Sequence, residues 1–163
     1  MSGNFKAGSK LGSSVYECVQ KLGEGEFGAA FLCKDDKGRR VVVKRFKKAT
    51  FDTEFELQAV TVVAARVPAH RNLCRFIDFV VDPGDELFSK GLAMVLEYCP
   101  LGSLEAFIEE RRQEAKPLME PELLQFASQL VAGLSALHDA GITHRNIGAR
   151  NVFLSQDERY ATE

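Results

Sequence analysis

The residue with the clearest chemical implication is Lys44, which ends the apolar run VVVK. A lysine on a mostly buried strand is unfavourable unless its charge is used, and a nucleotide phosphate and a helix carboxylate are suitable partners. Glu54 and Glu56 follow in a segment of helical composition. Because Val60 lies one turn after Glu56 and the polar Gln58 lies one turn after Glu54, we expect Glu56 to face the core and pair with Lys44. The alternative is that both glutamates are solvated and the lysine extends to water.

A glycine-rich stretch, GEGEFG, precedes this lysine, and Gly23, Gly25 and Gly28 fit the pattern GxGxxG. A dinucleotide-binding fingerprint needs a helix directly after the loop. Here the sequence predicts a strand, a turn at DDKG and a second strand. A glycine loop between antiparallel strands lets backbone amides approach phosphates without side chains in the way. The alternative is a hairpin turn that binds no ligand.

The elements that must position these residues come first in a β-rich half. Alternation and apolar content predict one helix, which Pro68 terminates, and several strands. The helix is expected over 51–66, and the strands over 15–22, 29–34, 39–46, 73–81 and 92–98.

A helical half follows. Ser103 is a suitable N-cap for a short amphipathic helix. A long helix is expected over 121–140, with Pro121 at its start and Gly141 just past its end. One apolar stripe runs along it, formed by Leu123, Ala127, Leu130, Leu134 and Leu137.

Four stretches, in their order and spacing, resemble a eukaryotic-type protein kinase: GEGEFGAAF, VVVK, VLEYCPLGSL and LHDAGITHRNIGARNVFL. Each is weak alone, but the set is highly specific. The GARN segment is more similar to the tyrosine-kinase branch than to the serine/threonine branch, which usually has a lysine at the position of Gly148.

The resemblance implies an α+β, protein-kinase-like fold. Residues 1–14 would be a polar tail and 15–98 a complete N-lobe, with an antiparallel sheet and one helix. Residues 99–163 would form the hinge and part of the C-lobe: two helices, the catalytic loop and the start of the next hairpin. We expect the chain to be truncated before the DFG motif, without its metal-binding aspartate or the activation loop.

By the same resemblance, the glycine loop would cover ATP, through Gly23, Gly25, Phe27 and Gly28. Lys44 would hold the α- and β-phosphates and pair with Glu56.

The adenine site would involve other positions. Leu96 would be the gatekeeper, Glu97 to Cys99 the hinge whose backbone meets adenine, and Phe153 the floor. Ala30 stands where the family usually has valine, and Val42 where it usually has alanine. The two departures keep the total volume of the roof above adenine, so we expect the apolar slot to be retained.

The catalytic loop would be HRNIGARN, with His144, Arg145 and Asn146 at its start. Asn146 occupies the catalytic-base position, where the family has aspartate. An amide is a very poor base, and loss of a positioned base lowers the rate by roughly 10²- to 10⁴-fold. Asn151 would ligate Mg²⁺, weakly without the DFG aspartate.

We therefore expect a fragment resembling ATP-dependent, tyrosine-type protein kinases that binds ATP but is catalytically impaired. The alternative is a pseudokinase-type module that binds a nucleotide or a partner without transferring phosphate. A protein partner would cover the exposed face of helix 121–140.

The overall composition of the chain argues against several other classes of function. The net charge of −2, with both signs interspersed, argues against a nucleic-acid or membrane-surface binder. The four cysteines are far apart and form no CxxC, which favours buried or half-buried free thiols in a reducing, cytoplasmic compartment.

Overall fold

The structure, a computed structural model, describes residues 10–11, 16–25, 28–47, 58, 61–82 and 91–155. The chain divides into two compact units. The first comprises residues 1–65 and 75–98, and the second comprises residues 66–74 and 99–163. Each unit is described below by itself.

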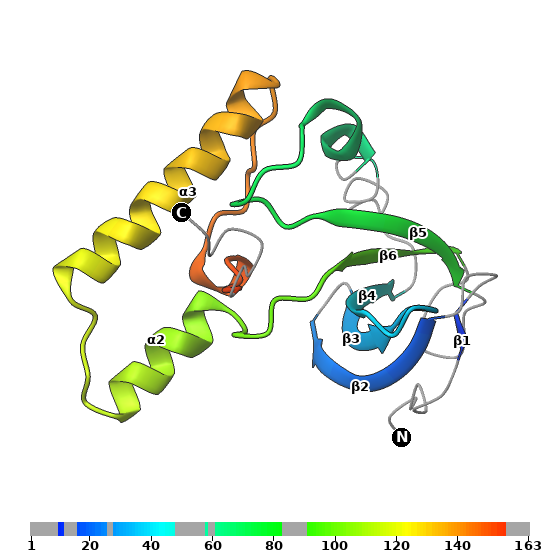
Figure 1. The fold of residues 1–163 in the computed structure, drawn as a ribbon, viewed down its shortest axis with the longest axis horizontal. Coiled ribbons are helices and arrows are strands. Elements are labelled where there is room, and N and C mark those ends of the chain that lie inside the picture. Colours follow the sequence, from blue (N-terminus) through cyan, green and yellow to red (C-terminus); the bar gives the residue numbers. More distant parts are fainter. Residues whose placement is uncertain are drawn as a thin grey trace. The chain divides into compact units, whose positions relative to one another are not determined.

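The first unit contains a six-stranded antiparallel sheet in the order β1-β2-β3-β4-β6-β5 (Figure 1). The strands are β1 Lys10–Leu11, β2 Tyr16–Glu24, β3 Gly28–Lys34, β4 Arg40–Phe46, β5 Phe76–Asp82 and β6 Gly91–Glu97. Five of these strands were predicted, and they are confirmed with shifts of a few residues at their ends. Strand β1 was not predicted, because it lies within residues 1–14, which were expected to form a polar tail. The largest shift is in β5, which begins three residues later than expected.

Strands β3 and β4 form the predicted hairpin. The Asp35 carboxylate accepts hydrogen bonds from the backbone N–H groups of Lys37 and Arg39, at 3.0 and 2.8 Å. Gly38 has a φ of 74°, which an L side chain adopts rarely. The predicted turn at DDKG is thus formed with an Asx-type bond and a left-handed glycine.

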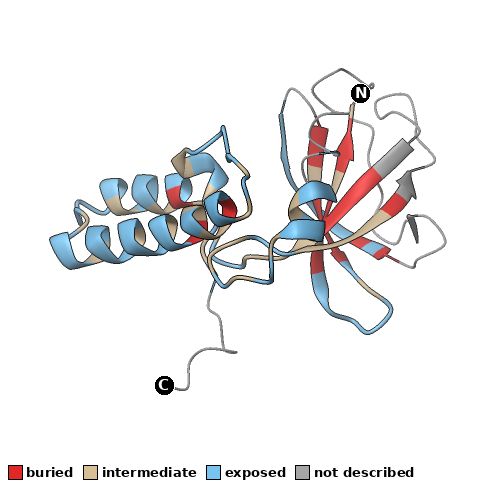
Figure 2. Ribbon diagram, turned by 90° about the horizontal axis from the view of Figure 1, so that it is seen from above, coloured by how far each residue is buried: buried red, intermediate tan, exposed pale blue. Residues whose placement is uncertain are grey.

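One face of the sheet forms the core of this unit. Alternate residues of β3, β4 and β6 are buried on it: Ala29, Phe31, Cys33, Val41, Val43, Ala93 and Val95. Figure 2 shows the buried positions gathered on the strands. The period of two follows from the pleat, and it leaves the intervening residues of each strand for the opposite face.

The helix predicted over 51–66 lies mostly outside the described residues. Positions 58 and 61–66 are helical, and the helix ends two residues before Pro68. None of the four cysteines, all of them in the described part of the chain, forms a disulfide bond. Cys18 and Cys33 are buried and Cys99 is half-buried, as predicted, but Cys74 is exposed because it lies in the irregular segment before β5.

The second unit contains the two predicted helices, α2 Leu104–Gln113 and α3 Glu120–Asp139. Ser103 caps α2 as expected, because its Oγ accepts a hydrogen bond from the Ala106 N–H at 3.2 Å. Gly141, with a φ of 73°, follows the end of α3 and donates its N–H to the His138 carbonyl at 2.8 Å. No helix in the described part of the chain is both long and apolar enough to span a membrane.

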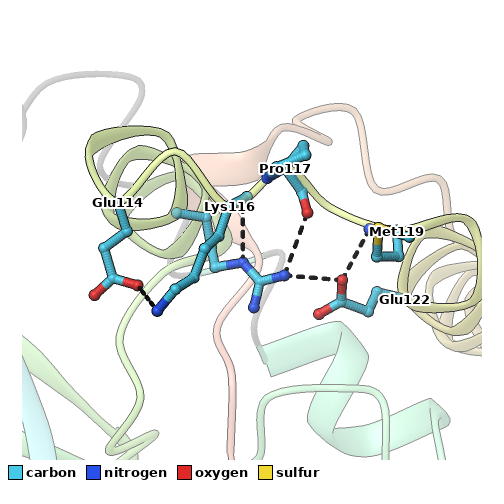
Figure 3. A network of polar contacts seen from close by, with 6 residues as sticks. Glu114, Lys116, Pro117, Met119 and Glu122 are labelled. Atoms are coloured by element: carbon cyan, nitrogen blue, oxygen red, sulfur yellow. Dashed lines mark hydrogen bonds and ion pairs between the residues drawn. The ribbon is translucent and has the colours of Figure 1, made fainter.

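A network of polar contacts joins α2 to α3 through the loop between them (Figure 3). Arg111 donates to the backbone carbonyls of Lys116 and Pro117 and to the Glu122 carboxylate, at 3.0, 3.3 and 3.1 Å. Glu122 also accepts the Met119 N–H at 2.8 Å and so caps the start of α3.

The inward face of α3 agrees with the predicted stripe only in its C-terminal part, where the stripe residues are buried or half-buried: Leu130, Leu134 and Leu137. Leu123 and Ala127, which belong to the same predicted stripe, are exposed. Phe126 is half-buried instead, and its ring packs edge-on against Phe107 of α2, with centroids 6.0 Å apart. The larger aromatic ring takes the position next to α2, and Ala127, one residue on, points about 100° away.

Candidate functional site

An open cavity of about 210 Å³ lies on the first unit, beside the glycine-rich segment. Its lining residues are Gly23, Glu24, Gly25, Gly28, Ala29, Ala30 and Lys44. The structure therefore brings the predicted glycines and the predicted phosphate-binding lysine to one concave surface. Phe27 and Glu56 lie outside the described residues.

The three glycines have different roles. Among the described residues, no atom lies within 4 Å of a Cβ placed on Gly23 or Gly25, so this part of the chain leaves their backbone open to a ligand. A Cβ on Gly28 would lie 2.2 Å from the backbone oxygen of Arg45. Gly28 is thus required by the close approach of β3 to β4, a packing role that the sequence pattern did not separate from the other two.

Lys44 lies on β4 opposite Ala30 of β3. It is half-buried, and its amine lies 5.4 Å from the centroid of the Phe46 ring. On the neighbouring strand β6, Met94 lies opposite Lys44 and Leu96 opposite Val42.

These pairings put the predicted roof and gatekeeper positions on the same sheet face as the lysine, because directly paired residues and alternate residues share a face. Ala30, Val42 and Leu96 are all half-buried. Met94 shares this face and is 1% exposed, yet it was absent from the predicted site. Its position two residues before Leu96 in an alternating strand was the available signal.

The residue at the end of β6 is fixed by two hydrogen bonds within the first unit. The Glu97 N–H donates to the Arg75 carbonyl at 3.0 Å, and the Glu97 carboxylate accepts the Arg75 N–H at 2.9 Å. Of the predicted hinge residues, Glu97 therefore has its amide engaged by the protein. Cys99, in the second unit, accepts the Gly102 N–H through its carbonyl at 3.3 Å.

The predicted catalytic loop lies in the second unit and is held by its own polar groups. The Asn146 N–H donates to Nδ1 of His144 at 3.3 Å, and the Asn151 side-chain amide donates to the Asn146 carbonyl at 2.9 Å. Arg145 has a φ of 64°, a left-handed conformation that is uncommon for a residue with a side chain. Backbone strain of this kind is concentrated at functional sites.

The segment after the loop is tied to the start of α2. Phe153 forms an isolated antiparallel bridge with Ser103, and the Leu104 N–H donates to the Val152 carbonyl at 2.8 Å. Phe153, predicted to form the floor under adenine, is 55% exposed, so much of its apolar side chain is accessible.

The described residues fit the expected Mg²⁺ site poorly. Among the described residues, no group of three or more His, Cys, Asp or Glu side chains is arranged to hold a metal ion. Mg²⁺ prefers an octahedral set of oxygens that includes carboxylates. One neutral amide oxygen of Asn151, whose nitrogen is bound to Asn146, does not supply such a set.

Comparison with known proteins gives a consistent result. The model of the protein kinase domain family matches residues 16–161. The chain is 29% identical over 154 residues to a probable serine/threonine-protein kinase zyg-1 from Caenorhabditis briggsae, covering 94% of this chain and 20% of that protein. It is 31% identical over 145 residues to the human serine/threonine-protein kinase Nek5, covering 87% of this chain and 19% of that protein. A Wee1-like protein kinase 2 from Xenopus tropicalis is 29% identical over 143 residues, covering 86% and 24% respectively. The chain thus spans about a fifth of the length of these relatives.

Proposed function

Because the chain belongs to the protein kinase domain family, we propose that it binds ATP at the cavity of the first unit and that Asn146 makes it a slow phosphotransferase. The observation that carries the binding proposal is the convergence of Gly23, Gly25 and Lys44 on one cavity. Open glycine backbone and a lysine amine are the groups that bind nucleotide phosphates in kinases. Ala30 and Val42, on the same sheet face, would contact the base.

Thermal unfolding in the presence of nucleotide tests this binding. At 100 times its Kd, a ligand that binds only the folded state stabilises it by about 2.7 kcal/mol. We expect ATP and ADP to raise the Tm of the 163-residue chain, and Lys44→Met to weaken the affinity more than about tenfold, since a hydrogen bond to a charged group contributes about 1.5–3 kcal/mol. Lys34→Met, an exposed position on β3, is the matched control for charge. No shift with wild type at millimolar ATP contradicts the proposal.

In the catalytic step, a bound metal ion would neutralise negative charge on the transferred phosphate. The residues that the structure describes do not supply a ligand set for such an ion. Asn146 would orient an acceptor hydroxyl through its amide oxygen without removing the proton. We expect Asn146→Asp to raise the rate by about 10²- to 10⁴-fold when Mg²⁺ is supplied. An unchanged rate would mean that the base position does not limit turnover.

The acceptor is proposed to be a protein hydroxyl. The GARN segment favours a tyrosine, whereas the names of two relatives carry serine/threonine. Paired peptide substrates that differ only in Ser, Thr or Tyr at one position distinguish the two classes.

A second candidate function is a pseudokinase-type module that binds nucleotide or a protein partner. Two observations favour it: the amide at the base position, and the exposure of Leu123, Leu124 and Val131 on α3. Nucleotide binding without turnover, even in Asn146→Asp with Mg²⁺ supplied, would support this function over catalysis. Free thiols at all four cysteines support the reducing, intracellular location that we propose for either function.

A further inference from the structure

A lysine outside the predicted site contacts the glycine-rich segment directly. Lys47 follows β4, and its Nζ donates to the Gly25 carbonyl at 2.9 Å and lies 2.7 Å from the Glu24 carboxylate. Glu24 is also paired with Lys21 on its own strand. The two ammonium groups, Lys21 first and then Lys47, lower the pKa of Glu24 to about 2. Glu24 is therefore ionised, and the pairing persists, throughout the neutral range.

Gly25 has no side chain through which the fold could hold it, and a Cβ there would meet no atom of the described residues within 4 Å. A glycine samples a wide range of backbone conformations, so its orientation must be set by bonds to its amide and carbonyl. The Gly25 N–H donates to the Gly28 carbonyl at 2.8 Å. The Lys47 amine holds its carbonyl, so both polar groups of Gly25 are fixed within the cavity lining.

We propose that Lys47 is a positioning residue for phosphate binding: it orders the Gly23–Gly25 backbone through Gly25 and Glu24, and it does not need to contact the nucleotide. This inference rests on the proposed ATP binding. Ion pairs at the surface contribute little to the free energy of folding, so stabilisation of the fold alone does not account for the contacts of Lys47. Ordering the backbone before the ligand arrives reduces the entropy that binding must otherwise overcome.

The first experiment measures Kd for ATP, ADP and adenosine by calorimetry on the full 163-residue chain. Lys47→Met and Lys21→Met each remove one positive charge and one of the two ion-pair partners of Glu24, but of these two lysines Lys47 is the one bonded to Gly25. We expect Lys47→Met to weaken ATP and ADP binding about two- to tenfold, the effect of one hydrogen bond. Adenosine binding should be unchanged, and Lys21→Met should change ATP binding less than twofold. Equal effects of the two substitutions overturn the proposal.

A second pair of variants separates positioning from simple attraction between charges. Glu24→Ala removes a negative charge beside the cavity. If Lys47 acted only as a positive charge, ATP would bind more tightly to this variant. If Lys47 acts through Glu24 and Gly25, ATP binding weakens, and that is the result we expect. Lys47→Arg, which retains the charge and the donor, should keep most of the wild-type affinity.

Controls keep the two proposals distinguishable. If the wild-type chain binds no nucleotide, the proposed function fails. If the wild type and Lys34→Met bind ATP while Lys47→Met binds it equally well, only the positioning role fails. Thermal unfolding of each variant without ligand should show a Tm close to that of wild type, because Glu24 and Lys47 lie at the surface. A large loss of Tm in Lys47→Met alone would indicate a structural role and overturn the proposal.

Discussion

The side-chain amide of Asn151 donates a hydrogen bond to the backbone carbonyl of Asn146 at 2.9 Å, across five residues of the catalytic loop. The bond joins the position expected to hold metal to the position expected to act as the base. Between them, the short 3₁₀ turn η1 Ala149–Asn151 is closed by the Asn151 N–H on the Gly148 carbonyl at 2.9 Å. Asn151 is therefore a structural element of the loop, whatever its role toward a metal.

Asn151→Leu tests this structural role, since leucine is similar in size but donates no hydrogen bond. We expect amide hydrogen exchange in 144–151 to increase by about two- to tenfold, corresponding to one hydrogen bond of about 0.5–1.5 kcal/mol. Asn72→Leu is unsuitable as a control because Asn72 packs against Gly133 of α3. Gln113→Leu, at the exposed end of α2, serves instead and should leave the loop unchanged. Unaltered exchange in Asn151→Leu would contradict the role.

The glycine pattern gives a second prediction. Replacement of two glycines of this motif by alanine should have different effects on the free energy of unfolding. Gly28→Ala would place a Cβ 2.2 Å from the Arg45 carbonyl, so β3 and β4 must separate. We expect the free energy of unfolding to fall by about 1–3 kcal/mol, as for other overpacked positions. Gly23→Ala, with open space around it, should be neutral or slightly stabilising because alanine restricts the unfolded chain. Denaturant unfolding measures the stability of both variants. Equal stabilities would contradict the close approach of β3 to β4 at Gly28.

A structural feature can be predicted from the sequence when the residues that determine it are close together in the chain. The strands, Ser103 and Gly141 were predicted because each depends on local periodicity or on one capping residue. The position of Lys44 on a strand beside the glycine loop was predicted for the same reason. The contact of Lys47 with Gly25 joins residues 22 positions apart and depends on how β2, β3 and β4 pair.

That pairing contains register shifts between Cys18 and Gln20 and between Lys21 and Gly23, which no local pattern indicates. The choice of Phe126 over Ala127 for the inward face of α3 likewise depends on Phe107 of α2. Such details arise from packing between elements, so they emerge only when the elements are placed together.

The titration of Glu24 provides a third prediction. Its folded-state pKa is lowered from 4.5 to about 2, first by Lys21 and then by Lys47. A carboxylate with a depressed pKa contributes stability that is present above its unfolded pKa and is lost as the pH falls through the folded pKa. The window is therefore about pH 4.5 down to 2. We expect a carboxyl carbon NMR titration with a midpoint near 2, shifted toward 4.5 in Lys21→Met and, less strongly, in Lys47→Met. A midpoint near 4.5 in wild type would contradict the pairing.

The end of α2 gives the last prediction, because Ala115 adopts a left-handed conformation with a φ of 54° just after the helix. The Lys116 N–H donates to the Arg111 carbonyl at 2.9 Å and the Ala115 N–H to the Arg112 carbonyl at 3.2 Å, a pattern of helix ends that usually places glycine at this position. An L side chain in this conformation is strained by roughly 1–2 kcal/mol, and glycine loses part of that gain through the entropy of the unfolded chain. We expect Ala115→Gly to raise the free energy of unfolding by about 0.5–1 kcal/mol. The same substitution in the first turn of the helix, Ala106→Gly, should instead lower it, because glycine has a lower helix propensity than alanine. Urea unfolding of both variants, followed by the circular dichroism of the whole chain, measures the two changes in the free energy of unfolding. A loss of stability in Ala115→Gly would contradict the strain at this position.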